Sequence, residues 1–175
     1  MVEWTTHEKL SLLACVIVII GSLLPWWSFI EKDQDLGLTL SFININPITG
    51  ITSPFFLISF SYYLYLAAGV IALAGAVLVF AALKKPWLGV LGGNLALFGP
   101  VLFMILLQLD VFDELTTYGL PQAYAFVYIS FLDDYGIPGY GLTLDMYVTY
   151  GSIIVLAGGI IGALAYTKWE GNLKV

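Results

Sequence analysis

The sequence contains no arginine, one cysteine (Cys15) and one histidine (His7) among its 175 residues. A single cysteine excludes a disulfide within the chain and a cysteine-based metal site. A single histidine excludes a haem held by two histidines of the same chain. Charged side chains make up 10% of the residues, whereas a soluble domain has roughly 25%. So few charges cannot solvate a water-soluble globule of this size, and the net charge of −6 opposes binding to nucleic acid.

Apolar residues are abundant instead: they form 60% of the chain, and its mean hydropathy is +0.94. A helix that crosses a bilayer takes about 20 mostly apolar residues, and four stretches are that long. These predicted spans are residues 10–27, 59–83, 86–109 and 146–167. Only two lysines separate the second span from the third, which indicates an antiparallel hairpin. The sequence thus predicts an all-α integral membrane protein, a single domain over residues 1–175 built as a four-transmembrane-helix bundle.

The distribution of charge orients these spans, because positively charged residues near span ends favour the cytoplasmic side. The two termini and the turn between the second and third spans carry five lysines and three acids. The two long loops, residues 28–58 and 110–145, carry one lysine and nine acids. The net charges on the two sides are therefore +2 and −8. This asymmetry predicts a multi-pass protein of the cell membrane with both termini in the cytoplasm and two outer loops.

Small residues within the spans predict how the helices pack. Close backbone contact replaces the hydrophobic force between helices in lipid, and glycines four residues apart allow it. The chain has two such pairs, Gly89 with Gly93 and Gly158 with Gly162. We interpret them as packing seams within the bundle, with homodimer faces as the alternative.

Polar residues within the spans bear on mechanism. No Asp, Glu, Lys or Arg lies near the middle of a predicted span, although a proton-coupled transporter or pump would normally need one. Asn94 is the most prominent polar residue, and its amide needs a hydrogen-bond partner, which we expect on a facing helix. The alternative is that Asn94 lines a site for a lipid or quinone headgroup near Pro100, where a kink is expected.

The outer loops are predicted to form a small β or irregular cap over the bundle. In the first loop, residues 36–42 alternate as in a half-buried strand, which residues 43–47 prolong. In the second loop, residues 124–132 are an aromatic and β-branched run that suits either a strand or an interfacial helix. Aromatic residues are enriched at protein interfaces. The candidate contact residues for a protein partner are Tyr124, Phe126, Tyr128, Phe131, Trp26 and Trp27, with a compact cap as the alternative interpretation.

Residues Leu24-Pro25-Trp26-Trp27 follow the first span directly. This tetrapeptide resembles the Leu-Pro-x-Trp that opens the first outer loop of the claudin-like tetraspan proteins. The predicted topology is similar as well, with four spans, cytoplasmic termini, a first outer loop of strand character and a tight cytoplasmic turn. The family's Gly-Leu-Trp and paired cysteines are absent. The resemblance implies adhesion or barrier assembly through the outer loops.

The sequence shows no catalytic constellation: no nucleophile–histidine pair, no phosphate-binding glycine loop and no metal cluster. We therefore expect a non-enzymatic protein without a cofactor, whose partners are the lipid bilayer and other membrane subunits or further copies of itself. It would act by association through its outer loops and helix faces, as an accessory or structural subunit of a membrane complex or in a self-assembling lattice. One alternative is a small redox or transport component that binds a quinone, lipid or small solute between helices. The other is a claudin-like cell-surface adhesion protein.

Overall fold

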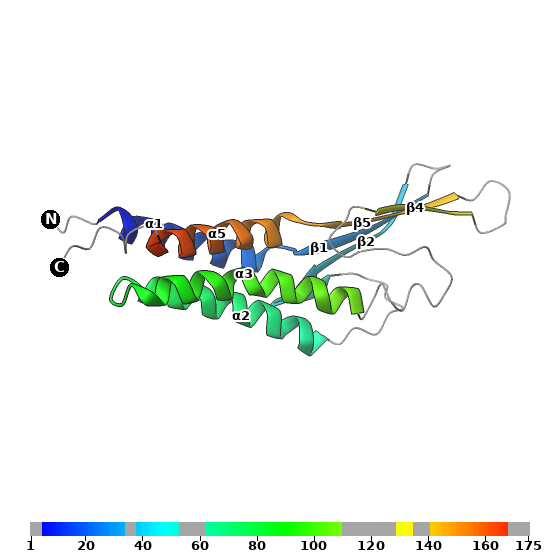
Figure 1. Cartoon of the computed structure of the whole chain (residues 1–175). Coiled ribbons are helices and arrows are strands. Elements are labelled where there is room, and N and C mark those ends of the chain that lie inside the picture. Colours follow the sequence, from blue (N-terminus) through cyan, green and yellow to red (C-terminus); the bar gives the residue numbers. More distant parts are fainter. Residues whose placement is uncertain (1–4, 34–37, 53–61, 110–128, 135–140, 168–175) are drawn as a thin grey trace.

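A computed structural model describes residues 5–33, 38–52, 62–109, 129–134 and 141–167 of the chain. Within them, helices gather at one end of a long molecule and strands at the other (Figure 1). The helices are α1 (Thr6–Leu23), α2 (Tyr62–Ala81), α3 (Trp87–Leu107) and α5 (Tyr150–Thr167). The strands are β1 (Trp27–Asp33), β2 (Leu38–Asn46), β3 (Gly50–Thr52), β4 (Ile129–Asp134) and β5 (Gly141–Val148).

The four helices form a bundle in which each helix has two main neighbours. Helix α1 packs against α2 and α5, and helix α3 packs against the same two helices from the opposite corner. Two of the helices, α1 and α3, are long and apolar enough to cross a membrane. The apolar stretches described in α2 and α5 are shorter. The predicted helical bundle is therefore present, and two of its helices have the length and composition of a membrane span.

Small residues set the distance between neighbouring helices. A Cβ atom built on Gly92 would lie 2.6 Å from the carbonyl oxygen of Gly75 in α2, and one on Gly93 would lie 2.4 Å from the backbone nitrogen of Ala163 in α5. A Cβ on Gly158 would lie 2.7 Å from Cγ2 of Val18 in α1. The backbones are thus in direct contact, as glycine allows.

The other two predicted packing glycines also face neighbouring helices of the same chain. A Cβ on Gly89 would overlap the ring of Tyr166 in α5, 2.0 Å from Cδ2. One on Gly162 would lie 2.9 Å from Cγ2 of Val79 in α2. Both glycine pairs therefore serve packing inside the bundle, the first of the two interpretations of their spacing.

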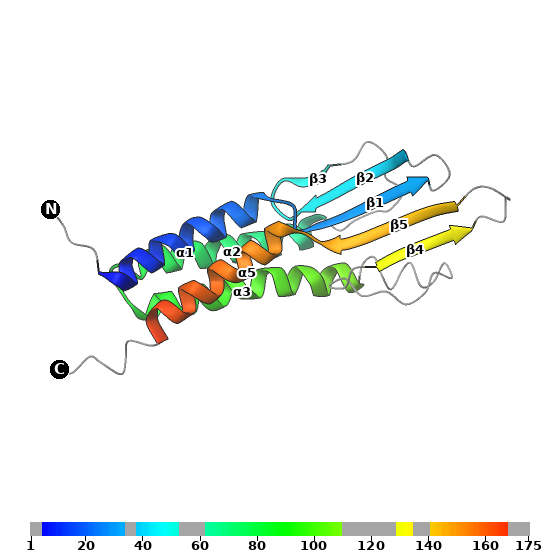
Figure 2. The ribbon, with the colours of Figure 1, turned by 90° about the horizontal axis from the view of Figure 1, so that it is seen from above.

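The strands of both outer loops join in one antiparallel sheet of order β3-β2-β1-β5-β4, seen face on in Figure 2. The strand predicted over residues 36–42 and prolonged over 43–47 is β2. Of the run 124–132, residues 129–132 belong to β4 and are a strand, whereas residues 124–128 lie outside the described residues. The cap is therefore a β-sheet built from both loops.

Three predicted span boundaries differ from the helix ends by four residues. Helix α1 begins at Thr6 rather than at residue 10 and ends at Leu23 rather than at residue 27, and α5 begins at Tyr150 rather than at residue 146. Strand residues occupy the positions predicted as the end of the first span and the start of the fourth. Trp27 of β1 lies opposite Val148 of β5 in the ladder that joins these two strands. An apolar strand that continues an apolar helix has the same hydropathy as the helix, so composition alone cannot separate them.

The junction between bundle and sheet is closed by a buried amide. Asn46, 4% exposed, ends β2 and donates from Nδ2 to the carbonyl oxygens of Ser22 (3.1 Å) and Leu24 at the end of α1. Its Oδ1 accepts from the backbone N–H groups of Ile48 (2.7 Å) and Thr49 (2.8 Å). One side chain thus satisfies terminal carbonyls of α1, which have no partner within the helix, and fixes the turn that follows β2.

The substitution Gly93→Ala tests the contact between α3 and α5. The added Cβ meets backbone, which cannot rotate away, so we expect the free energy of unfolding to fall by about 1–3 kcal/mol, as in other overpacked cores. Thermal unfolding in detergent measures this loss. Ala74→Leu is the matched control, because Ala74 is exposed on α2 and the larger side chain meets no neighbouring helix. Equal melting temperatures for the two variants would contradict the packing described here.

The substitution Asn46→Ala tests the junction. It removes the donor of two carbonyl oxygens at the end of α1, the Ser22 bond being buried and the Leu24 bond part-buried, and the acceptor of two part-buried bonds from N–H groups of the turn. A buried group left unsatisfied costs about 1–3 kcal/mol, so we expect a clear drop in the melting temperature. Thr49→Ala, at an exposed position of the same turn, should change it little. If Asn46→Ala unfolds at the wild-type temperature, the amide does not hold the junction.

Candidate functional site

The aromatic residues of the second outer loop were the first candidates for a partner surface. Tyr124, Phe126 and Tyr128 lie outside the described residues. Phe131 lies in β4, an edge strand of the sheet, where it is paired with Leu144 of β5. A contact surface on this loop therefore stays a prediction.

The two tryptophans after α1 are core residues, which corrects their prediction as partner contacts. Trp26 is 0% and Trp27 2% exposed. The indole Nε1 of Trp26 donates to the carbonyl oxygen of Gly21 at 3.0 Å, and its ring meets Phe103 of α3 edge-on at 5.4 Å. The chain turns into β1 directly after α1, and this turn packs the rings against the outer end of the bundle instead of exposing them at a membrane interface.

The outward faces of the helices are apolar. Between the helix ends, the exposed large residues include Leu12, Val16, Ile20, Val70, Val77, Phe80, Leu91, Phe98, Val101, Ile105, Ile153, Ile160 and Leu164. Soluble monomers rarely expose a continuous apolar surface of this extent. The exposed positions among the described residues of these faces are apolar with one exception, Asn94.

Asn94 lies on the outward face of α3. Its Nδ2 donates to the carbonyl oxygen of Val90, four residues earlier in the same helix, at 2.8 Å. The predicted bond to a facing helix is therefore wrong: the glycines before Asn94 occupy the inward faces of α3. A primary amide has two N–H donors and two acceptor lone pairs. Within the part of the chain that the structure describes, the bond to Val90 uses one donor and leaves the remaining capacity for a neighbour outside the bundle.

The exposed residues of α3 form a regular stripe along the helix. They alternate at intervals of four and three: Trp87, Leu91, Asn94, Phe98, Val101 and Ile105. This interval is the a/d pattern with which one helix packs along another in a left-handed pair. We call these six residues the α3 stripe. Between Leu91 and Ile105 it is an apolar surface with one hydrogen-bonding side chain, Asn94, and the indole N–H of Trp87 lies at its start.

A shallow groove of about 460 Å³ runs beside the half of the α3 stripe that is nearer the sheet. It is lined by Pro100, Val101, Met104, Ile105, Gln108, Leu109 and Leu156. It is almost entirely apolar. The alternative prediction places a lipid or quinone site near Pro100, and Pro100 does line this groove. Asn94 is not one of its lining residues, so the structure does not bring the predicted polar headgroup contact to this groove.

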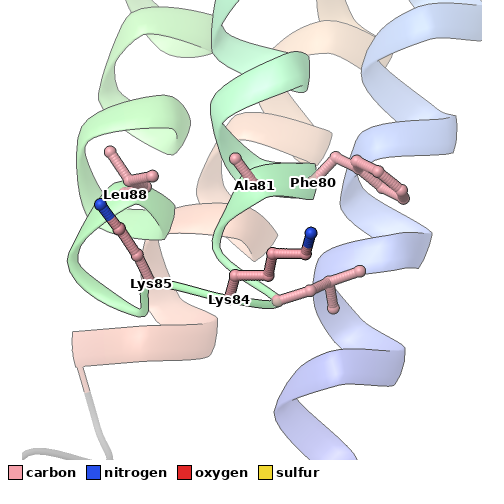
Figure 3. Close-up of a pocket in the computed structure, with 6 residues that line it drawn as sticks. Phe80, Ala81, Lys84, Lys85 and Leu88 are labelled. Carbon is pink, nitrogen blue, oxygen red and sulfur yellow. The ribbon is translucent and has the colours of Figure 1, made fainter.

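A second groove of about 460 Å³ lies at the opposite end of the bundle, at the turn between α2 and α3 (Figure 3). Its walls are apolar except at Lys84 and Lys85. The described charges are distributed unevenly between the two ends of the molecule. The helical end carries Lys9, Lys84 and Lys85 with one acid, Glu8, whereas the described sheet carries one lysine, Lys32, and five acids: Glu31, Asp33, Asp133, Asp134 and Asp145.

A buried polar contact ties α1 to α5 near the helical end. The Ser11 hydroxyl, 0% exposed, lies 2.7 Å from the Tyr166 hydroxyl, and the ring of His7 meets that of Tyr166 edge-on at 6.0 Å. Sequence reasoning missed this pair, because neither residue type is unusual at its position. Within the described residues, no group of three or more His, Cys, Asp or Glu side chains is placed to hold a metal ion.

Together, these features define a four-helix bundle with an apolar outward surface, an exposed amide (Asn94) on that surface and a β-sheet cap. No protein-family model and no curated protein matches the chain.

Proposed function

We propose that the chain is a four-span membrane protein that acts by association, as a structural or accessory subunit, and that the α3 stripe is its contact surface within the membrane. Helices α1 and α3 support the embedding by length and composition. Helices α2 (20 residues) and α5 (18 residues) pack beside them and have apolar outward faces as well. An 18-residue helix rises about 27 Å, close to the hydrocarbon thickness of about 30 Å.

The ends of the bundle support the orientation with cytoplasmic termini. The start of α1, the turn between α2 and α3 and the end of α5 lie at the end away from the sheet (Figure 1). Three lysines (Lys9, Lys84 and Lys85) and one acid (Glu8) lie at this helical end, whereas the described sheet carries five acids and one lysine, Lys32. Cations next to span ends favour the cytoplasmic side, so the sheet would face outward.

The observation that carries the proposal is the exposure of Asn94. It lies seven residues after Trp87, about 10 Å along the helix axis, and so below the headgroups of the cytoplasmic leaflet. Hydrocarbon offers no hydrogen bond to an amide, and burying an unpaired one is costly. A neighbouring helix with a polar group at the same depth removes that cost, and such contacts contribute roughly 0.5–1.5 kcal/mol between transmembrane helices.

A second copy of the chain meets this requirement directly. All copies insert in the same orientation, so Asn94 lies at the same depth in each. A two-fold axis along the membrane normal then brings the stripe of one copy onto the stripe of the other, with like residues facing. An amide both donates and accepts, so two Asn94 side chains are complementary. This geometry favours self-assembly over a different subunit, which would need its own polar group at that depth.

A second candidate function is binding of an apolar ligand, such as a quinone or lipid chain, in the groove beside Pro100. The apolar lining of that groove favours it. Adhesion of the claudin-like kind would involve the outer loops and remains a prediction from the sequence.

The substitution Asn94→Leu tests the contact surface. It keeps the stripe apolar but removes the amide pair, so we expect the dissociation constant of the dimer to rise about fivefold, as loss of about 1 kcal/mol implies. Asn94→Gln should retain most of the affinity. Energy transfer between labelled copies in vesicles, measured against protein density, gives the constants. A wild-type chain that remains monomeric at all densities would refute the proposal, and so would equal affinity of Asn94→Leu.

Cross-linking tests the geometry independently. In a Cys15→Ser background, Asn94→Cys should form a disulfide between copies under mild oxidation, because a disulfide requires Cβ atoms about 3.5–4.5 Å apart. Val77→Cys is the matched control: Val77 is exposed on α2, away from the stripe. Cross-links of equal yield at both positions would indicate random collision.

A further inference from the structure

The groove at the turn between α2 and α3 combines an apolar floor with two cations. Phe80, Ala81, Leu83 and Leu88 contribute the apolar walls, and Lys84 and Lys85 line the same space. Figure 3 shows both lysine side chains turned back from the turn toward the helices, Lys84 on the side of Phe80 and Lys85 on the side of Leu88.

The backbone holds the two lysines in the turn, and their charges have no ion-pair partner among the described residues. The backbone N–H groups of Lys84 and Lys85 both donate to the carbonyl oxygen of Ala81, at 3.0 and 3.2 Å, which fixes the turn. Both side chains are exposed, and neither ammonium group forms an ion pair with another of the described residues. The site therefore offers two positive charges above an apolar surface, and a ligand with the opposite charge and an apolar tail complements it.

We propose that this groove binds an anionic phospholipid of the leaflet on the side of the lysines. The phosphate would lie between the ammonium groups of Lys84 and Lys85, and an acyl chain would follow Phe80, Leu83 and Leu88. Basic pockets between transmembrane helices on the cytoplasmic side bind anionic headgroups in this way. The inference rests on the membrane embedding in the proposed function but not on the α3 stripe.

Two features favour a lipid over a free phosphate ion. Apart from the two lysines, the walls are apolar, and they add nothing to the binding of an inorganic ion. Trp87, 61% exposed, begins α3 directly after the turn, and an exposed tryptophan next to a span is typical of the headgroup region. If the two lysines only set the orientation of the chain in the membrane, their charge alone would suffice and an adjacent apolar groove would not be needed.

Native mass measurement of the purified full chain tests this site. The protein in detergent is titrated with phosphatidylglycerol or with phosphatidylcholine of the same acyl chains, and bound lipids are counted. The wild type should bind phosphatidylglycerol more tightly. Each lysine near an anionic headgroup contributes enough for about a fivefold effect, so Lys84→Gln combined with Lys85→Gln should weaken phosphatidylglycerol binding about thirtyfold and leave phosphatidylcholine binding unchanged.

Two further variants distinguish lipid binding in the groove from a general attraction of anionic lipid to positive charge. Lys9→Gln removes an exposed lysine outside the groove and should have little effect. Ala81→Leu keeps both charges but fills the groove, and should weaken phosphatidylglycerol binding. Equal binding of the two lipids to the wild type would overturn the proposal. Equal losses for Lys9→Gln and the double variant would do so too, as would binding of inorganic phosphate at the lipid's affinity.

The same spectra report the number of subunits, so the two proposals fail separately. If the lipid site fails but the proposed function holds, dimers persist and the two lipids bind alike. If self-association fails but the lipid site holds, monomers retain the selective lipid. The lysine and alanine substitutions lie outside the α3 stripe, and their melting temperatures show whether each variant is folded.

Discussion

The contact of α3 with two neighbours through adjacent glycines determines most of what this molecule presents to its surroundings. Gly92 meets the backbone of α2 and Gly93 that of α5, so the rotation of α3 about its axis is fixed. Successive residues of a helix are separated by about 100°. The next residue, Asn94, is therefore turned outward, and Leu91 and Phe98 lie on the same side. The outward amide is a consequence of the inward glycines.

Small residues at the helix contacts also determine which residues the other helices expose on their outward faces. In the interior of this bundle small residues lie where backbones meet, and many large apolar residues point outward, although others such as Tyr65 and Phe103 are buried. A soluble bundle has the reverse order, with large apolar residues inside and polar ones outside. The cap is joined to this bundle at two places: Asn46 donates to carbonyls at the end of α1, and β1 and β5, which follow α1 and precede α5, are paired with each other. The surface available for association is thus defined by the bundle.

Hydropathy and turn residues were sufficient to predict four apolar helices, the hairpin of α2 and α3, the strand β2 and a cap, which they left as either β or irregular. They could not locate the ends of α1 and α5, where an apolar strand continues an apolar helix. They also misplaced Trp26 and Trp27, since nothing in the sequence shows that the chain turns inward after Pro25. The outward direction of Asn94 was predictable in principle from residue size. The small residues Gly92, Gly93, Ala96 and Gly99 mark the inward side of α3, and Asn94 lies on the other side of the helix.

The central claim is that the bundle lies in lipid and that a partner covers the α3 stripe. Spin labels at Val16, Val77, Leu91, Phe98 and Ile160, one at a time in bilayers, test both parts through collision with oxygen and with a water-soluble nickel chelate. We expect low nickel access at all five positions, high oxygen access at Val16, Val77 and Ile160, and reduced oxygen access at Leu91 and Phe98. High nickel access throughout would contradict the embedding, and equal oxygen access at all five positions would contradict the partner.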